Sequence, residues 1–355
     1  MASALWWRRL ARRVAGFGAL VSLVFAAACG GDTTGRNDAG GGLTTVRVNS
    51  VGGAADVPLY IAKEKGFFAE EGLQVEFVPV KNTSDLPALL SGGEIDFAIG
   101  QPNAAFFNAA ATGLKDPVVL ATNTYDVRTR IPGLLVRKEL ADSGEVKTAA
   151  DLKGRKIAVI GPSTSSQYFA EKVLEGAGLT ASDVKFTVLG LPDMVTALSS
   201  GAIDAAWMFE PLASKAVKDG AGVRMASVGE VAPGFPSWVQ ASEKIMGDRK
   251  TVQAFVNALM KAIADYDGLL KPDDRDAIVA VLVKYTQQKD ASDWDGVELP
   301  TVNVEGGFDQ SLVDAFQAYL IDRGVVKTHT DVAKLSDFSF RDAYLAAAPS
   351  AAAPR

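Results

Sequence analysis

The chain has 355 residues, of which 48% are hydrophobic and 22% are charged. This length and composition favour a globular protein of two domains with a real hydrophobic core. The formal net charge is −6 and the sequence has no long run of basic residues, which argues against a nucleic-acid partner. His329 is the only histidine and Cys29 the only cysteine. We therefore expect no histidine-based metal site, no Ser-His-Asp triad, no intramolecular disulfide and no cofactor.

The first 28 residues have the pattern of a secretion signal. Arginines among residues 1–13 precede an apolar stretch at 14–28 that is too short for a comfortable membrane span. The stretch ends in LVFAAAC, which resembles a bacterial lipobox, with Cys29 as the lipidated first residue of the mature protein. The alternative is cleavage at residues 26–28, with Cys29 incidental. Residues 29–44 are expected to form a flexible tether, and residues 346–355 a disordered tail.

Between these ends, apolar strands alternate with helical stretches, a pattern typical of parallel βαβ units. In the first half we expect a strand at 45–49, a helix at 58–71, a strand at 74–80, a short helix at 86–90, and strands at 95–99, 118–121 and 133–137. The second half repeats the pattern with a strand at 156–160, a helix at 167–176, and strands at 184–189 and 203–208. From residue 252 to about residue 344 the periodicity is helical.

The chain also contains an internal repeat. The sequence DLPALLSGGEIDFAIGQP at 85–102 is echoed by DMVTALSSGAIDAAWMFEP at 193–211, and the same shift places Tyr60 on Tyr168. The repeat predicts two lobes of one α/β design with a cleft between them, where a small ligand would bind. Asp96 and Asp204 occupy the same place in the repeat, at the starts of buried strands, and are predicted to be turn or cap residues and not catalysts.

Several segments together resemble a known family. VPLYIAKEKGFFAEEGLQVE, LLSGGEIDFAIG, DLKGRKIAVIGPSTSSQYFAEKVLEGAGL and AIDAAWMFEP are similar to the periplasmic solute-binding proteins of ABC transporters for nitrate, sulfonates, taurine and thiamine-precursor pyrimidines. The resemblance covers residues 46–325. It implies an α/β chain with the type II periplasmic-binding-protein fold, which has two lobes, a cleft and a two-segment hinge. It also implies capture of a ligand without chemistry, outside the cytoplasm, and delivery to a permease driven by a separate ATPase.

The helical block at the C-terminal end has no counterpart in the second lobe, so we expect it to pack back on the first lobe. The chain would then cross between the lobes twice, near residues 133–140 and 234–242, and two crossings make a hinge. The first lobe is predicted to comprise residues 45–137 and 242–345. The second lobe is predicted to comprise residues 138–241.

Ligands of open α/β sheets bind at the carboxyl ends of the strands. The strongest candidate there is the loop GPSTSS, which follows a strand and opens a helix, so that free N–H groups and hydroxyls point outward. Ser163, Thr164, Ser165 and Ser166 would cradle a sulfonate, carboxylate, phosphate or nitrate. The alternative is simple capping of the helix by one of these side chains.

The matching loops of the first lobe supply uncharged polar groups. Ser50 and Gly52 follow the first strand, and Gln101 and Asn103 follow the third, where they offer amide donors and acceptors. The alternative for Gln101 and Asn103 is ordinary loop polarity. Tyr125, near a strand end, and Trp238, in the second crossing, are aromatic candidates for a flat or organic ligand. Trp207, within an apolar strand, is expected in the core.

Three charged residues leave two readings open. Glu210, in FEP, would bind an amine or a ring N–H of the ligand, or would form a structural bond at the hinge. Arg128 and Arg130 would pair with an anion, or would lie solvated at the surface.

The sequence therefore predicts an extracytoplasmic solute-binding lipoprotein, or a periplasmic protein, that is a monomer and not an enzyme. Its partners would be a small organic, anionic solute, the permease and ATPase, and the membrane through the lipid anchor. Sulfonates, taurine-like compounds and pyrimidine precursors rank above nitrate. The alternatives are a ligand-binding subunit of a membrane sensor, or a secreted enzyme that uses Glu210 or Asp56 as a base. One branch of the family makes the thiamine pyrimidine with its own histidine and a cysteine-rich motif, and this chain has neither.

Overall fold

The computed structural model describes residues 42–80, 82–112, 118–124, 129–130, 132–271 and 274–348. Residues from Gly42 onward form one compact unit. The predicted signal, Cys29, almost all of the predicted tether, Tyr125 and Arg128 lie outside the described residues, as does most of the predicted tail. No helix among the described residues is long and apolar enough to cross a membrane.

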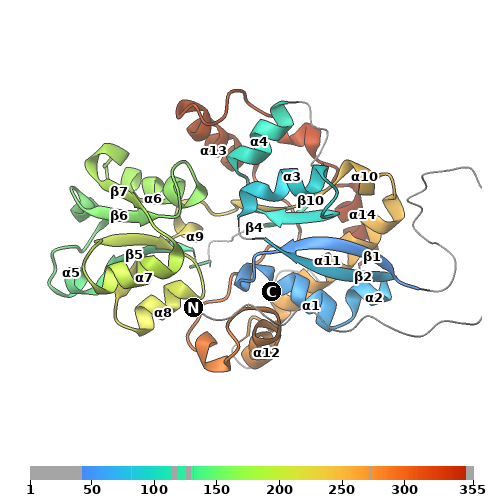
Figure 1. Cartoon of the computed structure of the whole chain (residues 1–355), viewed down its shortest axis with the longest axis horizontal. Coiled ribbons are helices and arrows are strands. Elements are labelled where there is room, and N and C mark those ends of the chain that lie inside the picture. The colour runs from blue at the N-terminus through green and yellow to red at the C-terminus, as the bar shows by residue number, and fades with distance from the viewer. Residues whose placement is uncertain are drawn as a thin grey trace, which may run out of the picture. The chain divides into compact units, whose positions relative to one another are not determined.

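The first lobe is built around a five-stranded sheet of order β2-β1-β3-β10-β4 (Figure 1). Its strands are β1 (Thr44–Ser50), β2 (Leu73–Pro79), β3 (Phe97–Gly100), β4 (Val118–Thr124) and β10 (Pro236–Ala241). β1 is parallel to β2 and β3, whereas β10 is antiparallel to both β3 and β4. The helices between these strands are α1 (Val57–Glu64), α2 (Phe67–Glu70), α3 (Leu86–Ser91) and α4 (Ala104–Ala111).

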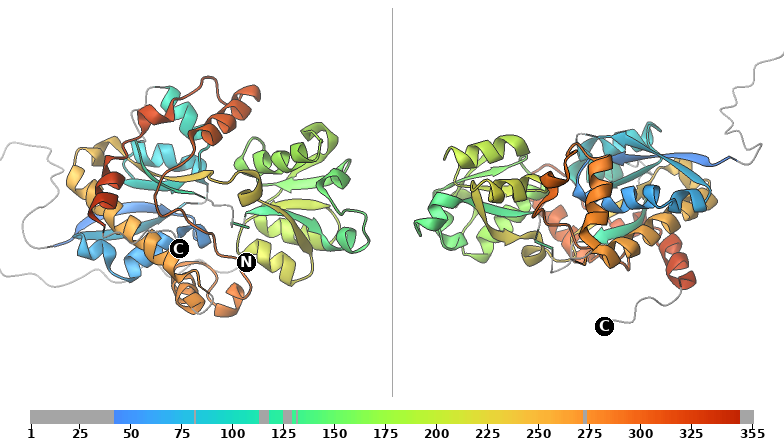
Figure 2. Two further views of the ribbon diagram at one scale, coloured as in Figure 1. Left: turned by 180° about the vertical axis from the view of Figure 1, so that it is seen from behind. Right: turned by 90° about the horizontal axis from the view of Figure 1, so that it is seen from below.

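The second lobe repeats this plan with the sheet β7-β6-β8-β5-β9. Its strands are β5 (Gly133–Arg137), β6 (Lys156–Val159), β7 (Lys185–Val188), β8 (Ala205–Met208) and β9 (Gly222–Ser227). Here β5 is the antiparallel member, between β8 and β9. The helices are α5 (Lys138–Asp142), α6 (Ser165–Gly176), α7 (Leu191–Ser199), α8 (Leu212–Lys218) and α9 (Val228–Val231). Figure 2 shows each sheet with its own helices from two further directions.

The boundary between the lobes differs from the predicted one by two strands. Gly133–Arg137 was expected in the first lobe but pairs with the second sheet, and Pro236–Ala241 was expected in the second lobe but pairs with the first sheet. The chain passes from one lobe to the other before each of these segments. As a result β5 pairs between β8 and β9, and β10 pairs between β3 and β4. Because an apolar run fits a buried strand of either sheet, its sequence does not reveal the partner.

The predicted helix at 58–71 is interrupted. Pro58 lies in the first turn of α1, where a missing N–H costs nothing, but Gly66 adopts a left-handed φ of 78° and separates α1 from α2. The break turns the buried face of α2, with Phe67 and Phe68, toward the C-terminal helices.

The C-terminal block consists of α10 (Glu243–Met246), α11 (Arg249–Leu269), α12 (Arg275–Tyr285), α13 (Gln310–Asp322) and α14 (Ser339–Ala347). α11 packs on the first lobe, as expected, and its Phe255 stacks on Phe97 of β3 with ring centroids 3.8 Å apart. α13 departs from the expectation, because its Phe316 packs against Tyr168 of α6 at 5.1 Å. The block therefore covers parts of both lobes.

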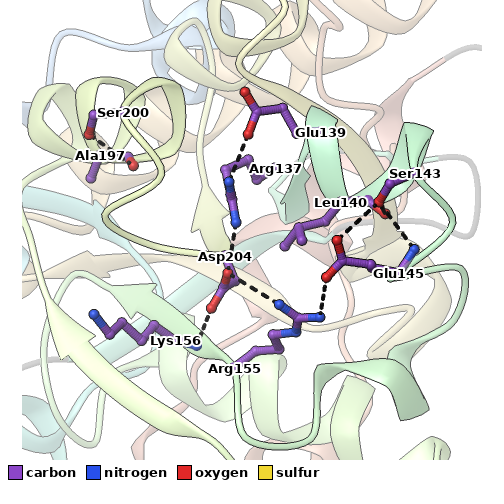
Figure 3. Close-up of polar contacts among 10 residues, drawn as sticks. All are labelled: Arg137, Glu139, Leu140, Ser143, Glu145, Arg155, Lys156, Ala197, Ser200 and Asp204. Carbon is purple, nitrogen blue, oxygen red and sulfur yellow. Dashed lines mark hydrogen bonds and ion pairs between the residues drawn. The ribbon is translucent and has the colours of Figure 1, made fainter.

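The two repeat-related aspartates make the same contacts. Asp96 Oδ2 accepts the Arg47 N–H at 2.9 Å, and Asp204 Oδ2 accepts the Lys156 N–H at 2.9 Å, each from the neighbouring strand. Asp204 also pairs with Arg137 at 3.2 Å (Figure 3). Both carboxylates thus tie the start of their own strand to the backbone of the neighbouring strand, which agrees with their interpretation as structural residues.

Candidate ligand-binding site

The carboxyl ends of the two sheets are joined by a direct hydrogen bond. Ser165, at the start of α6 in the second lobe, donates from Oγ to Oε1 of Gln101, which follows β3 in the first lobe, at 2.9 Å. Both side chains are half-buried. The structure therefore brings together two of the predicted site residues, one from each lobe.

The other hydroxyls of the GPSTSS loop hold the loop in shape. Thr164 donates to the Gly161 carbonyl at 2.8 Å and shares a hydrogen bond of 2.9 Å with Ser166. Ser166 is fully buried and accepts the Ile160 N–H at 3.1 Å. Ser163 has a left-handed φ of 56°, and its N–H donates to Gln167 Oε1 at 2.8 Å. The side chain that reaches across to the first lobe is that of Ser165.

α6 presents its N-terminus at this place. Thr164 is the N-cap residue, but its side chain makes no capping bond to the helix. The first-turn N–H groups of a helix have no carbonyl partner within it, and α6, with 12 residues, adds a partial positive charge at this end. The hydroxyl of Thr164 therefore does not cap the helix, although Thr164 is its N-cap residue.

In the first lobe, a buried carboxylate organises the loop after β1. Asp56 Oδ2 accepts hydrogen bonds from Ser50 Oγ, Tyr60 Oη and the N–H groups of Val51 and Gly52, at distances between 2.8 and 3.1 Å. Burial raises the pKa of Asp56, although these hydrogen bonds oppose the shift. Burial, followed by the nearby Asp56 charge, also raises the pKa of Tyr60. Ser50 and Gly52 are therefore held by the lobe itself.

Two further candidates have structural contacts. Asn103 caps α4, because its Oδ1 accepts the Phe106 N–H at 2.9 Å. Trp238 was expected at the cleft but is fully buried on β10, where its ring lies 4.7 Å from that of Phe106. The reason is the position of β10 between β3 and β4. Trp207 is also fully buried, on β8.

Glu210 follows β8, and only 3% of its side chain is exposed. Its Oε1 accepts from Ser214 Oγ at 2.6 Å and from Arg224 Nη2 at 3.0 Å, and its Oε2 accepts the Ser214 N–H at 3.0 Å. The N–H of Glu298, in the C-terminal segment, lies 3.3 Å from Oε1. These are the contacts of the second interpretation, a structural bond beside the hinge. Arg130 lies 3.7 Å from the Glu298 carboxylate and is mostly exposed.

Sequence reasoning did not identify Tyr60 or Arg224 and considered Asp56 only as a base. For Asp56 and Tyr60 the sequence did contain a signal, because residues four apart at the start of a helix lie on the same face. For Arg224 no local signal exists, since its partner Glu210 belongs to a different element.

The described part of the chain contains no cluster of three His, Cys, Asp or Glu side chains able to hold a metal ion. A pocket of about 340 Å³ lies beside α8, and its lining includes Lys215, Lys218, Asp219, Asp293 and Asp295 but none of the predicted binding residues. Its mixed charges include an internal pair of 2.7 Å between Lys215 and Asp219, so the carboxyl ends of the strands remain the better candidate.

A model of the NMT1/THI5-like family matches residues 55–267, which is more than half of the chain. The chain belongs to the NMT1/THI5-like family. The predicted relationship is thereby confirmed, and the match spans the carboxyl ends of β3, β6 and β8.

Curated relatives of this family member have two kinds of name. The chain is 30% identical over 148 residues to the 4-amino-5-hydroxymethyl-2-methylpyrimidine phosphate synthase of Aspergillus parasiticus, a match covering 42% of this chain and 40% of the relative. It is 28% identical over 234 residues to a Bacillus subtilis protein that carries the name binding protein YtlA, covering 62% of this chain and 65% of the relative. The matches thus span less than two thirds of the length of these relatives.

Solved structures show the fold. The periplasmic nitrate-binding protein NrtA of Synechocystis PCC 6803 superimposes with a TM-score of 0.67 at 19% identity, covering 87% of this chain and 90% of that one. The periplasmic aliphatic sulphonate-binding protein SsuA of Escherichia coli gives 0.65 at 18% identity, covering 82% and 91%. The predicted type II periplasmic-binding-protein fold is confirmed.

Proposed function

We propose that this chain is an extracytoplasmic solute-binding protein that captures a small organic solute with an acidic group between its two lobes. The observation that carries the proposal is the hydrogen bond between Ser165 and Gln101, which brings the carboxyl ends of the two sheets together beside the N-terminus of α6. Membership of the NMT1/THI5-like family and the fold support it.

In this proposal the acidic group of the ligand binds the first-turn N–H groups of α6 and the Ser165 hydroxyl. Anions are stabilised at helix N-termini by both the free donors and the helix dipole. Gln101 would contact the ligand from the opposite lobe. A ligand that contacts both lobes favours their closed arrangement by the difference in its binding energy between the two states.

Sulfonates, taurine-like compounds and thiamine-precursor pyrimidines are the proposed solutes, ahead of nitrate. The names of the Escherichia coli and Synechocystis proteins support an acidic solute, and the Aspergillus relative supports a pyrimidine. Glu210 gives no support to an amine-bearing ligand, because Arg224 and Ser214 occupy its carboxylate.

Delivery to a permease, driven by a separate ATPase, is proposed from the family. We also propose that lipidation of Cys29 holds the protein at the membrane through the tether at residues 29–44. The lobes would then work as one monomer close to the permease.

The alternative of an enzyme is favoured by the synthase name of the Aspergillus relative. Two contacts oppose it. The imidazole of His329 lies 3.1 Å from Asp314 on α13 and is about half exposed. The Asp56 oxygen Oδ2 is occupied by donors of its own lobe. We therefore propose binding without chemistry. A sensor subunit would use the same site, and neighbouring permease and ATPase genes would favour transport.

The test is a thermal-shift screen, followed by calorimetric titration, with alkyl and aryl sulfonates, taurine, aminopyrimidines, aromatic acids, nitrate and bicarbonate. We expect saturable stabilisation by an organic acid, growing with the ratio of ligand concentration to dissociation constant. Ser165→Ala should weaken binding about tenfold, the loss of a hydrogen bond to a charged group. The control is Ser199→Ala, at an exposed position on α7, which should bind the ligand normally. Equal affinity of the two variants would contradict the placement of the site, and turnover of any compound would support the enzyme.

A further inference from the structure

Two exposed apolar side chains occupy the same position in the two lobes. Val51 is 45% exposed and follows β1, and Ile160 is 41% exposed and follows β6. The registers of the two sheets match, because Val48 pairs with Phe97 in the first and Ile157 with Ala205 in the second. Val51 and Ile160 each lie three residues beyond these pairs, so the register of the two sheets, one residue offset from the sequence repeat, places an apolar side chain at both sites.

Both side chains are exposed on a fixed backbone. The Val51 N–H donates to Asp56 Oδ2 at 2.8 Å, and the Ile160 N–H donates to Ser166 Oγ at 3.1 Å. Both acceptors are buried: Asp56 directly precedes α1, the helix after β1, and Ser166 lies in the first turn of α6, the helix after β6. The backbone N–H groups are therefore turned into the lobes and satisfied there, while the β-branched side chains remain in solvent.

Their place is the region where the lobes meet. Ile160 begins the loop that leads to Ser165, which is bonded to Gln101, and Gln101 follows β3, the neighbour of β1. Val188, the last residue of β7, is 56% exposed and pairs with Val159, directly before Ile160. Apolar side chains thus accompany the hydroxyls and the helix N-terminus at the carboxyl ends of the strands.

We propose that Val51 and Ile160 determine specificity by contacting, from opposite lobes, an apolar body attached to the acidic group of the ligand. This inference rests on the proposed function and narrows its solute to an amphipathic organic acid with an aliphatic or aromatic body. An inorganic anion would leave both side chains in water. When the lobes close on a ligand with a longer apolar body, the two side chains and that body are all removed from water.

The experiment is calorimetric titration with linear alkanesulfonates from methanesulfonate to octanesulfonate. For the unmodified protein we expect affinity to rise by about two- to fourfold for each added methylene until the space between the lobes is filled. The Val51→Ser, Ile160→Ser double variant should bind methanesulfonate as the unmodified protein does but lose most of this dependence on chain length. The Val51→Leu, Ile160→Leu variant should retain it.

The matched control is Val217→Ser, a change of an exposed valine on α8 outside the carboxyl ends of the strands. It should leave the whole series unchanged. Full dependence on chain length in the serine double variant, with its thermal midpoint preserved, would overturn the role of Val51 and Ile160 and leave the proposed function standing. If the affinity of the unmodified protein does not depend on the length of the alkyl chain, the role of Val51 and Ile160 is likewise overturned and the proposed function stands. Absence of binding by every alkanesulfonate would overturn this inference, and the proposed function would then be decided separately by the thermal-shift screen with the other acids.

Discussion

At the scale of single residues, the side chains that sequence reasoning placed in the cleft divide into two groups. Ser165 and Gln101 contact each other across the lobes, whereas Asn103 and Ser166 complete backbone hydrogen bonds of their own lobe, and Glu210 is held by Ser214 and Arg224 of its lobe and by the Glu298 N–H. The second group is polar because the backbone of a strand end or a helix start must be satisfied where regular pairing stops. Polarity at a strand end is therefore weaker support for a ligand contact than a side chain that reaches the other lobe.

Glu210 gives a prediction at this scale. Glu210→Ala should lower the free energy of unfolding by about 1.5–3 kcal/mol, because it removes a charged hydrogen-bond partner of the largely buried Arg224, which keeps only Glu298 at 3.4 Å as a carboxylate partner. Urea unfolding measures the loss. In the Glu210→Ala, Arg224→Met double variant the loss should be smaller than the sum of the single losses. A loss below about 0.5 kcal/mol for the single variant, or a change in ligand affinity without a change in stability, would assign Glu210 to the ligand.

At the scale of elements, the C-terminal helices are divided between the lobes by their aromatic side chains. α11 belongs to the first lobe through Phe255, while α13 lies on α6 through Phe316 and through the ion pair of Arg323 with Glu171. Asn108 of α4 donates to the Val325 carbonyl just beyond α13 at 3.0 Å. α13 therefore contacts an element of each lobe.

A core variant of α13 tests this packing. Phe316→Ala should lower the free energy of unfolding by about 3–5 kcal/mol, because the ring is 1% exposed and packs between Tyr168 and Phe235. Chemical denaturation followed by tryptophan fluorescence checks the value. Leu345→Ala, an exposed position on α14, serves as the control and should change the stability little. A small loss for Phe316→Ala would mean that α13 is not part of the cooperative core.

The contact between α1 and α12 gives a pH dependence. Glu64 of α1 accepts hydrogen bonds from Lys284 Nζ at 2.6 Å and from Tyr285 Oη at 2.9 Å, and these, Lys284 first, lower its pKa. A carboxyl with a lowered folded-state pKa stabilises the fold above its unfolded pKa of about 4.3, and this contribution is lost as the pH falls through the folded value. The stability difference between the unmodified protein and Glu64→Gln should therefore shrink between pH 6 and pH 3. A difference that stays constant in urea unfolding across this range would contradict the pairing.

The elements also show what the sequence could predict. The repeat revealed two lobes of one design, because the same residues recur in the same order. Strand–helix alternation located the strands from β1 to β8, but it did not predict β9, β10, α4, α8 or α9. The exchange of β5 and β10 was missed, since the partner of a strand is decided by tertiary packing and not by its own residues. The packing of α13 on α6 was missed for the same reason. An amphipathic pattern shows that one face of a helix is buried, but it does not show which element covers that face.

The sequence selected residues that the folded chain brings together. The rule that ligands bind at the carboxyl ends of strands selected Ser165 and Gln101, which form a hydrogen bond, and their contact with a ligand stays a prediction. Trp238 was selected for a different reason, because a tryptophan that follows two prolines in a crossing segment is typical of an exposed position. The network of Asp56 was not foreseen, since its four donors come from the end of β1, the loop after it and α1.

At the scale of the whole molecule, the two lobes are joined by more than the two crossings. One cluster of buried apolar residues includes Phe106 and Trp238 of the first lobe, Phe169 of the second and Phe316 of α13. On the other side, the Glu298 N–H contacts Glu210. Closure around a ligand must therefore preserve contacts on both sides of the hinge, which favours a small rotation about a packed axis over a free swing.

The exchanged strands set an order on synthesis. Every strand of the second sheet lies between Gly133 and Ser227, whereas the first sheet still needs β10, which ends at Ala241. A chain that leaves the ribosome N-terminus first therefore completes the later lobe before the earlier one. Until β10 is synthesised, the facing edges of β3 and β4 have no strand partner, and unpaired strand edges promote aggregation. A pause between Ser227 and Pro236 would hold a finished second sheet beside an unfinished first one.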